Sequence, residues 1–176
     1  MSRIGTTRPT LRLVQGTHDD EVAWSWFCGH CAAPAPSNEP PAPTARVCRQ
    51  CGLGVLLEAR ADASPSPRDA FLVVDSRMLV HAMSKEAERL LKVREEVAVN
   101  RPLSELLVPA EAESDASGFA AAIAAAASTR DELSHAFVRP WNTYGVRVRA
   151  RIATCGPPRA ALIVLEGTRP PDLQLL

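Results

Sequence analysis

The sequence has no excess of charge of either sign and no long apolar run. Its 176 residues include 20 Lys or Arg and 20 Asp or Glu, so the formal net charge at pH 7 is zero. A neutral chain lacks the overall positive charge that is typical of proteins bound to nucleic acid or to anionic membranes. No segment reaches the ~18 consecutive apolar residues that a membrane-spanning helix needs, so we expect no membrane association.

The N-terminal residues also lack the pattern of a secretion signal. Residues 1–15 contain arginines but no apolar core of the kind found in signal peptides. We therefore expect a cytoplasmic protein with reduced thiols, and clustered cysteines in that compartment favour metal binding over disulfides. The fifth cysteine, Cys155, stands alone after an alternating apolar segment and is expected to be a buried structural thiol.

The other four cysteines form two Cys-x-x-Cys pairs with sixteen residues between them. The first pair is Cys28 with Cys31, and the second is Cys48 with Cys51. This spacing is typical of four-thiolate zinc sites, and Zn²⁺ accepts four thiolates in tetrahedral geometry. Because four protein ligands leave no open position for water or substrate, the predicted zinc ion is structural. His18 and His30 are possible substitute ligands, although exposure to solvent is the simpler expectation for both.

The first cysteine pair has a second interpretation, because Cys-Gly-His-Cys is also an active-site motif of disulfide oxidoreductases. In that class of enzyme the pair opens a helix. Here the proline-rich residues 32–45 follow the pair, and proline cannot continue a helix. No nucleophile–base constellation is evident elsewhere. We therefore expect a protein that is not an enzyme, and a thiol oxidoreductase ranks third among the candidate functions.

Composition divides the chain into five segments. Residues 1–21 form a polar extension, residues 22–58 hold the paired cysteines, and residues 59–68 are a Ser/Pro-rich linker. Residues 69–167 carry the periodic patterns of a folded domain, and residues 168–176 form a short tail. The cysteine module is too small to bury enough apolar surface to fold alone, so a metal would supply much of its stability.

Residues 69–167 are predicted to contain two strands, short helices, one longer helix and three further strands. The first two strands are residues 71–74 and 78–83, and Ser84 can cap the helix that follows them. Residues 103–107 form a short helical turn, and an alanine-rich helix covers about 114–128. The last three strands are expected at about residues 132–139, 145–154 and 159–167.

This order of elements resembles that of PAS domains. Residues 71–75, FLVVD, are similar to the first strand and acidic turn of the family. Residues 84–91, SKEAERLL, are similar to its Asn-x-x-Ala-x-x-Leu-Leu-Gly helix, with Ser84 in place of the asparagine and Lys92 where the glycine is expected. The resemblance implies an α+β fold with a five-stranded antiparallel sheet and helices on one face. It also implies dimerisation and a role in sensing ligands, redox state or light.

The cysteine module resembles a zinc ribbon, whose knuckles often read Cys-Pro-x-Cys-Gly. The second pair keeps the trailing glycine as Gly52, whereas Ala32 takes that position after the first pair. A left-handed turn at this position suits glycine. The resemblance therefore implies a small zinc-ribbon module in front of the PAS-like domain, in which the first knuckle departs from the family pattern at Ala32.

The PAS resemblance also restricts the chemistry of sensing. The longer helix has no histidine or cysteine that could bind haem iron, and no cysteine near Asn100 could form a flavin photoadduct. The ligands that stay compatible with the sequence are a non-covalently bound flavin and an unidentified small molecule in an apolar cavity. Residues that would line such a cavity, or that simply form the core, are Leu103, Leu107, Phe119, Ile123 and Val148.

The sequence therefore predicts a non-enzymatic signal-sensing or regulatory protein. Its PAS-like domain would bind a small ligand or a protein partner, and that partner could be a second copy of the chain in a homodimer. Its zinc ribbon would be structural. The second interpretation is a zinc-ribbon transcription regulator that binds nucleic acid under control of the PAS-like domain. The few basic residues near the knuckles, Arg46, Arg49 and Arg60, count against this second interpretation.

Overall fold

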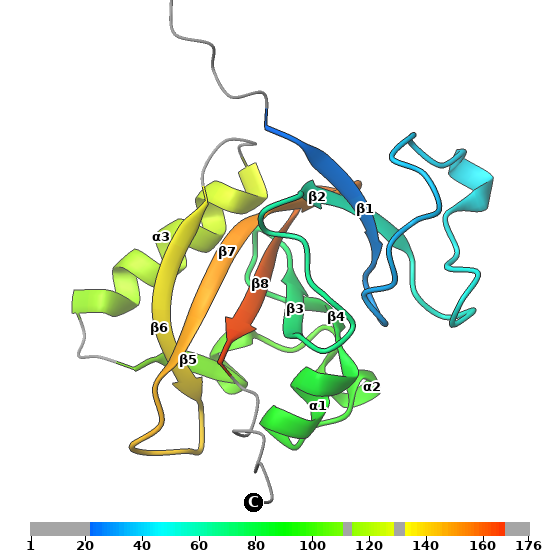
Figure 1. Cartoon of the computed structure of the whole chain (residues 1–176). Helices are drawn as coiled ribbons and strands as arrows, with labels where there is room; N and C mark the ends of the chain where they lie inside the picture. Colours follow the sequence, from blue (N-terminus) through cyan, green and yellow to red (C-terminus); the bar gives the residue numbers. More distant parts are fainter. Residues whose placement is uncertain (1–21, 111–113, 129–132, 168–176) are drawn as a thin grey trace, which may run out of the picture.

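The centre of the molecule is a curled antiparallel sheet (Figure 1). The computed structural model describes residues 22–110, 114–128 and 133–167, so the predicted extension 1–21 and tail 168–176 lie outside it. The strands in the described residues are β1 Trp24–Cys28, β2 Leu56–Arg60, β3 Ala70–Val74, β4 Val80–Met83, β5 Leu107–Pro109, β6 Ser134–Pro140, β7 Val148–Gly156 and β8 Ala160–Glu166. Six of them lie in the order β1-β2-β7-β8-β3-β4, while β6 pairs with β7 and β5 with β6.

Helices pack on the sheet from one side and bury an apolar core there. The helical elements are α1 Lys85–Leu91, α2 Glu95–Ala98, α3 Ser114–Ser128 and the 3-10 turns Pro43–Ala45 and Leu103–Glu105. Helix α3 packs on β7 and β8, and α1 packs on β3. Ser84 caps α1 by accepting a hydrogen bond from the Ala87 amide, as predicted. None of the described helices has both the length and the apolarity needed to cross a membrane.

The mixed α+β architecture and the antiparallel sheet confirm the predicted fold class at this coarse level. Residues 69–167 contribute one strand more than the predicted five, because β5 pairs with β6 along residues 107–109. Leu107 was predicted to belong to the helical turn 103–107, but it begins the strand β5. Pro109 lacks an N–H donor, but it is tolerated in this short strand, which pairs only with β6 among the described strands.

The helix α1 ends in a left-handed residue. Lys92 stands where the PAS pattern has glycine, and it adopts a φ of 55°. Its backbone N–H donates to the Glu88 carbonyl and closes the helix. The conformation costs a non-glycine residue about 1–2 kcal/mol, so the turn is retained here without the residue that forms it most easily.

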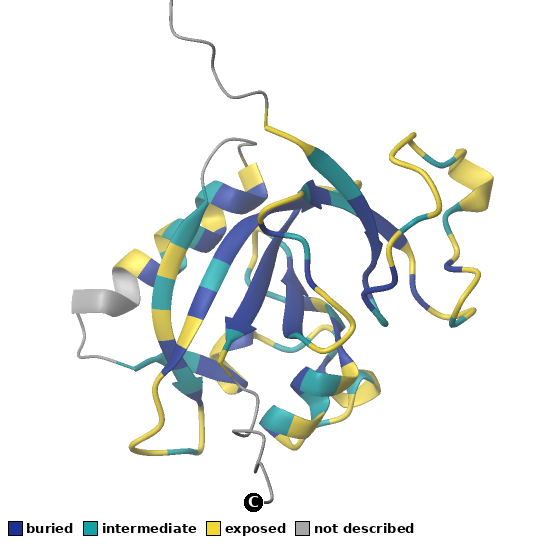
Figure 2. Ribbon diagram, in the orientation of Figure 1, coloured by how far each residue is buried: buried dark blue, intermediate teal, exposed yellow. Residues whose placement is uncertain are grey.

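The central strands β3 and β8 are buried on both faces of the sheet (Figure 2). Along β3, Leu72 faces the helices and Phe71 faces the other side. The second face is covered by the β1–β2 hairpin, where Phe27 and Leu57 pack in the same cluster as Phe71. The rings of Phe27 and Phe71 meet edge to face, 5.9 Å apart between centroids. The hairpin thereby holds the cysteine segment against the outer face of the sheet.

The cysteine segment and the larger domain share one sheet. Strand β2 pairs with the end of β7, with Glu58 opposite Gly156 and Ala59 opposite Cys155. Strand β2 ends at Arg60, two residues inside the predicted linker 59–68. Figure 1 shows the loop between β1 and β2 projecting from the hairpin on the side away from α3.

Candidate metal centre

The four paired cysteines lie together at one end of the β1–β2 hairpin. Cys28 is the last residue of β1, and Cys31 follows in the next turn. Cys48 and Cys51 flank a second turn that precedes β2. All four sulfurs lie within 4.8 Å of one another, so two segments far apart in the sequence contribute equally to one cluster.

The spacing of the sulfurs matches that of a tetrahedral metal site. The Sγ–Sγ distance is 3.7 Å from Cys28 to Cys51 and 3.8 Å from Cys31 to Cys48. A disulfide requires about 2.05 Å, and these cysteines are free thiols. Four sulfurs at about 2.3 Å from a central zinc ion stand roughly 3.8 Å apart. The cluster is a candidate four-thiolate metal site.

The two knuckles have the same backbone geometry despite their different sequences. The amide of Ala32 donates to the Cys28 carbonyl and the amide of Gly52 donates to the Cys48 carbonyl, both at 2.9 Å. Ala32 and Gly52 occupy the same position after each pair, and both are left-handed, with φ values of 56° and 69°. The alanine in the first knuckle therefore does not change the turn.

Amide N–H groups surround the sulfurs. The amides of His30 and Cys31 lie 3.4 Å from the Cys28 sulfur, and the amide of Gly54 lies 3.4 Å from the Cys51 sulfur. Such N–H groups stabilise thiolate over thiol, because they place partial positive charge beside the sulfur. The backbone is thus arranged for anionic sulfur, which is the form that binds metal.

The thiols differ in how readily they lose a proton. Burial raises the pKa of Cys28 and of Cys31, because a thiolate is poorly solvated there. Burial also acts to raise the pKa of Cys51, but the amides of Gly54 and Leu53 and contacts with the neighbouring thiols lower it to about 6. One thiolate is therefore favoured at neutral pH, and a divalent cation would supply the positive charge that stabilises the others.

Gly54 is a residue of the centre that the sequence analysis missed. A Cβ atom at this position would lie 2.3 Å from the Cys28 sulfur and 2.7 Å from the His30 Cβ. The signal for it was slight, a glycine three residues after the last cysteine. Glycine is required here because the second loop passes very close to the first knuckle. No local sequence pattern indicates this contact.

His30 connects the first knuckle to the larger domain and is not a metal ligand here. Its Nδ1 lies 2.7 Å from Oε2 of Glu95, and its side chain is only 12% exposed. The expectation of a solvent-exposed histidine was wrong, because α2 lies over this part of the knuckle. The second oxygen of Glu95 accepts a hydrogen bond from the Met83 amide at 3.0 Å. His18 lies outside the described residues.

The five residues predicted to line a ligand cavity are brought together in the core between the sheet and the helices. All of them are buried, and they belong to one apolar cluster; they are Leu103, Leu107, Phe119, Ile123 and Val148. This arrangement is that of packed core, and their contact with a ligand stays a prediction. Cys155 is buried as expected, and burial raises its pKa to about 12.

Comparisons with known proteins add little to this description. The sequence matches no known protein family and no curated protein. Among solved structures, it is similar to the PAS domain of a protein from Colwellia psychrerythraea, at 16% sequence identity and a TM-score of 0.36. That alignment covers 56% of this chain and 84% of the other. A likeness this weak carries no conclusion about function.

Proposed function

We propose that this chain is a non-enzymatic sensory or regulatory protein in which a PAS-like domain carries a structural zinc ribbon. The observation that carries the metal assignment is the group of four thiols, with Sγ–Sγ distances of 3.7 and 3.8 Å between its two loops. Thiolate ligands select soft and borderline ions, and zinc is the usual occupant of a closed tetrahedral four-cysteine site.

The backbone after the first cysteine pair supports a structural centre over a redox-active one. The residues after Cys31 form a turn and a bridge between Phe27 and Pro34, whereas a redox pair of this type opens a helix. With all four thiols bound to a metal, the protein would have no free thiol at this site.

The sensory assignment is supported by the arrangement of residues 69–167. Two strands, short helices, a longer helix and three long strands follow one another in the predicted order, with the short strand β5 added before the longer helix, and helices α1 and α3 pack on the sheet. This is the order that resembles PAS domains. The bound ligand or protein partner, and a dimeric state, are what that resemblance implies.

The metal centre and the PAS-like domain are proposed to act as one unit. Strand β2 continues the sheet beside β7. The knuckle residue His30 contacts Glu95 at the start of α2. A change at β4 or α2 on ligand or partner binding would therefore reach the metal loops through Glu95, which also holds the Met83 amide of β4.

Metal analysis and native mass spectrometry of the purified protein test this proposal. We expect one zinc ion per chain, and loss of that ion in Cys31→Ala, because three thiolates bind zinc much more weakly than four. Cys155→Ala is the matched control and should retain the zinc, because Cys155 lies outside the cluster. A folded, metal-free protein would contradict the metal assignment. Reduction of insulin that is lost in Cys28→Ser would contradict the non-enzymatic assignment.

A further inference from the structure

The β1–β2 hairpin covers the outer face of β3 and β8, but the outer face of β6 and of the first residues of β7 is largely exposed. Successive side chains of a strand point to opposite faces of the sheet. Val138 and Val148 face the helix-side core, so the residues that alternate with them point outward. These outward residues are His135, Phe137 and Arg139 on one side and Arg147, Arg149 and Arg151 on the other. We call them, with Trp141 and Tyr144 of the loop between β6 and β7, the arginine face.

Aromatic side chains are concentrated on the arginine face. The chain has three tryptophans, one tyrosine and four phenylalanines. Within the described residues the exposed ones are Phe137, Trp141 and Tyr144, at 41%, 60% and 84%. Figure 2 shows exposed residues along β6 and in the loop that leads to β7. Exposed apolar patches on soluble proteins mark interaction sites, and aromatic and arginine side chains are enriched at protein interfaces.

The rings hold two of the guanidinium groups in place. The guanidinium carbon of Arg147 lies 3.7 Å from the centroid of the Phe137 ring, and that of Arg139 lies 4.9 Å from the centroid of the Tyr144 ring. Arg139 also donates to the Trp141 carbonyl at 3.1 Å, which ties the loop to the strand. Side chains that are ordered before binding lose less conformational entropy when a partner arrives.

Positive charge exceeds negative charge on this face. Arg149 and Arg151 share one carboxylate, that of Glu166, at N–O distances of 3.4 and 3.3 Å. The Arg149 side chain is still 53% exposed, and exposed ion pairs contribute little stability, so a partner's carboxylate can compete for its donors. Four arginines thus stand against one glutamate among the described outward residues of β6, β7 and β8, in a chain whose net charge is zero.

We propose that the arginine face binds an acidic segment of a partner protein. Carboxylates of that segment would pair with Arg147 and Arg149, because guanidinium groups bind carboxylates through two parallel hydrogen bonds. Apolar side chains of the same segment would pack against Trp141 and Tyr144. The proposal specifies the kind of protein partner and so rests on the regulatory function proposed above, but it does not depend on the metal centre.

Single-stranded nucleic acid is the main competing partner, because bases stack on exposed aromatic rings beside basic side chains. Two features favour the acidic segment. Guanidinium groups of this chain already lie over the rings of Phe137 and Tyr144, where bases would have to stack. The chain is also neutral as a whole, so it lacks long-range attraction for a polyanion.

Three fluorescein-labelled probes distinguish these partners: the acidic peptide EDFEDLEDF, its amide counterpart QNFQNLQNF and a single-stranded oligothymidylate of matched length. Each is titrated with the zinc-loaded full chain, and binding is measured by fluorescence anisotropy. We expect the acidic peptide to bind at least roughly tenfold more tightly than its amide counterpart, because each exposed ion pair contributes up to about fivefold and several form at once. The oligothymidylate should bind more weakly than the acidic peptide.

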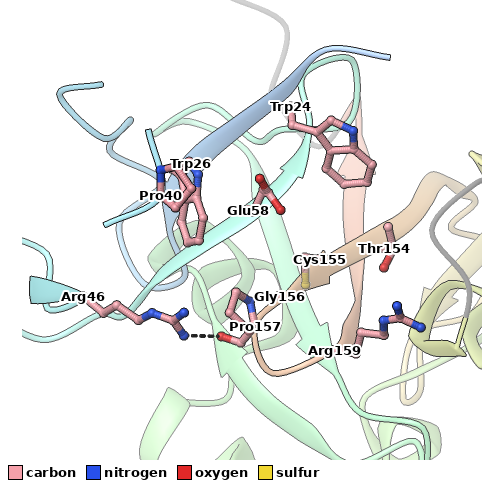
Figure 3. Close-up of a pocket in the computed structure, with 10 residues that line it drawn as sticks. All are labelled: Trp24, Trp26, Pro40, Arg46, Glu58, Thr154, Cys155, Gly156, Pro157 and Arg159. Atoms are coloured by element: carbon pink, nitrogen blue, oxygen red, sulfur yellow. Dashed lines mark hydrogen bonds between the residues drawn. The ribbon is translucent and has the colours of Figure 1, made fainter. Parts of the chain in front are cut away.

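The indole N–H signals in ¹H–¹⁵N NMR locate the binding surface. The signal of Trp141, assigned from Trp141→Phe, should shift when the acidic peptide is added. Trp24 and Trp26 are internal controls, because they line a separate cavity of about 420 Å³ between the β1–β2 hairpin and the turn between β7 and β8 (Figure 3). Their signals should stay in place.

Substitution of paired arginines completes the test. The double variant Arg147→Gln/Arg149→Gln should weaken binding of the acidic peptide roughly tenfold and leave binding of the amide peptide unchanged. The control is Arg89→Gln/Arg94→Gln, which removes the same charge from side chains that are 70% and 77% exposed near α1 and α2. It should bind the acidic peptide normally.

Four results would overturn the proposal: no binding of the acidic peptide, equal binding of the amide peptide, tighter binding of the oligothymidylate, or a Trp141 signal that stays in place. Equal affinity of the two double variants would also overturn it, since the effect would then be absent or due to net charge alone. Zinc content, measured on the same samples, reports separately on the metal centre. A zinc-loaded chain that fails to bind the acidic peptide would therefore contradict this proposal and leave the metal assignment intact.

Discussion

At the scale of single residues, the metal centre depends on how closely two loops can approach each other. Gly54 donates to the Cys51 sulfur and accepts a hydrogen bond from the Cys48 amide at 2.8 Å. The hydrogen on its Cα faces the first knuckle, where a methyl group would overlap the Cys28 sulfur. One small residue therefore allows the two Cys-x-x-Cys loops to bring their four sulfurs together.

Gly54→Ala should disrupt the metal centre. The added Cβ would lie 2.3 Å from the Cys28 sulfur, so one loop must move, and overpacking of this kind costs about 1–3 kcal/mol. We expect zinc affinity to fall at least roughly tenfold, as measured by competition with a chromophoric chelator. Gly118→Ala is the matched control: no atom lies within 4 Å of its added Cβ. It should bind zinc normally and raise the free energy of unfolding by up to about 1 kcal/mol. Normal zinc affinity in Gly54→Ala would refute this account.

At the scale of secondary-structure elements, the short helix α2 contacts both β4 and the first knuckle through Glu95. The backbone N–H of Glu95 donates to Oε1 of Glu88 at 2.6 Å, and its carboxylate binds both the Met83 amide and His30. One side chain therefore joins α2, β4 and the first knuckle. A four-residue helix has little stability of its own, so these contacts position it.

Glu95→Ala should loosen the contact between the metal loops and the domain. The change leaves the Met83 amide and the His30 ring without their acceptor, which costs about 1–3 kcal/mol for a buried donor. We expect a lower free energy of unfolding in urea and faster release of zinc to a chelator. Glu96→Ala is the control, because Glu96 is exposed and pairs only with Arg94 among the described residues. Equal zinc release from both variants would show that Glu95 does not couple the two parts.

At the scale of the whole molecule, the sheet has two cores, and only one of them is closed by the hairpin that carries the four clustered cysteines. The core on the helix side includes Leu72 and Ile163 and lies away from the cysteines. The core on the other side is closed by Phe27 and Leu57 of the hairpin that carries the metal loops. Loss of the metal should therefore affect one face of the sheet more than the other.

Removal of the metal with a strong zinc chelator should unfold the loops and leave the central sheet intact. Hydrogen exchange followed by mass spectrometry should show lost protection across residues 26–57, since no other described contact replaces four metal bonds. Strands β3 and β8 should keep their protection, because their helix-side contacts remain. The control is the same chelator already saturated with zinc. Unfolding of the entire chain, or exchange unchanged by chelation, would contradict this division.

The predictions that were confirmed concern features that depend on residues close together in the sequence. Ser84 caps α1 because its hydroxyl needs only the Ala87 amide one turn away. The local pattern predicted a strand at about residues 159–167, and β8 covers Ala160–Glu166. The contact of His30 with Glu95 joins residues 65 positions apart, and no periodicity could indicate it. The pairing of β2 with β7 and the additional strand β5 were missed for the same reason.

The sequence by itself determined which four thiols cluster, the α+β character and the order of the elements apart from β5, because spacing and periodicity act over a few residues. Only the tertiary structure decided that the cysteine hairpin continues the sheet beside β7 and that Gly54 makes room for the Cys28 sulfur. These outcomes depend on which distant surfaces bury each other. The free energy of that burial comes from contacts between segments that are distant in the sequence, so the residues of one segment do not reveal it.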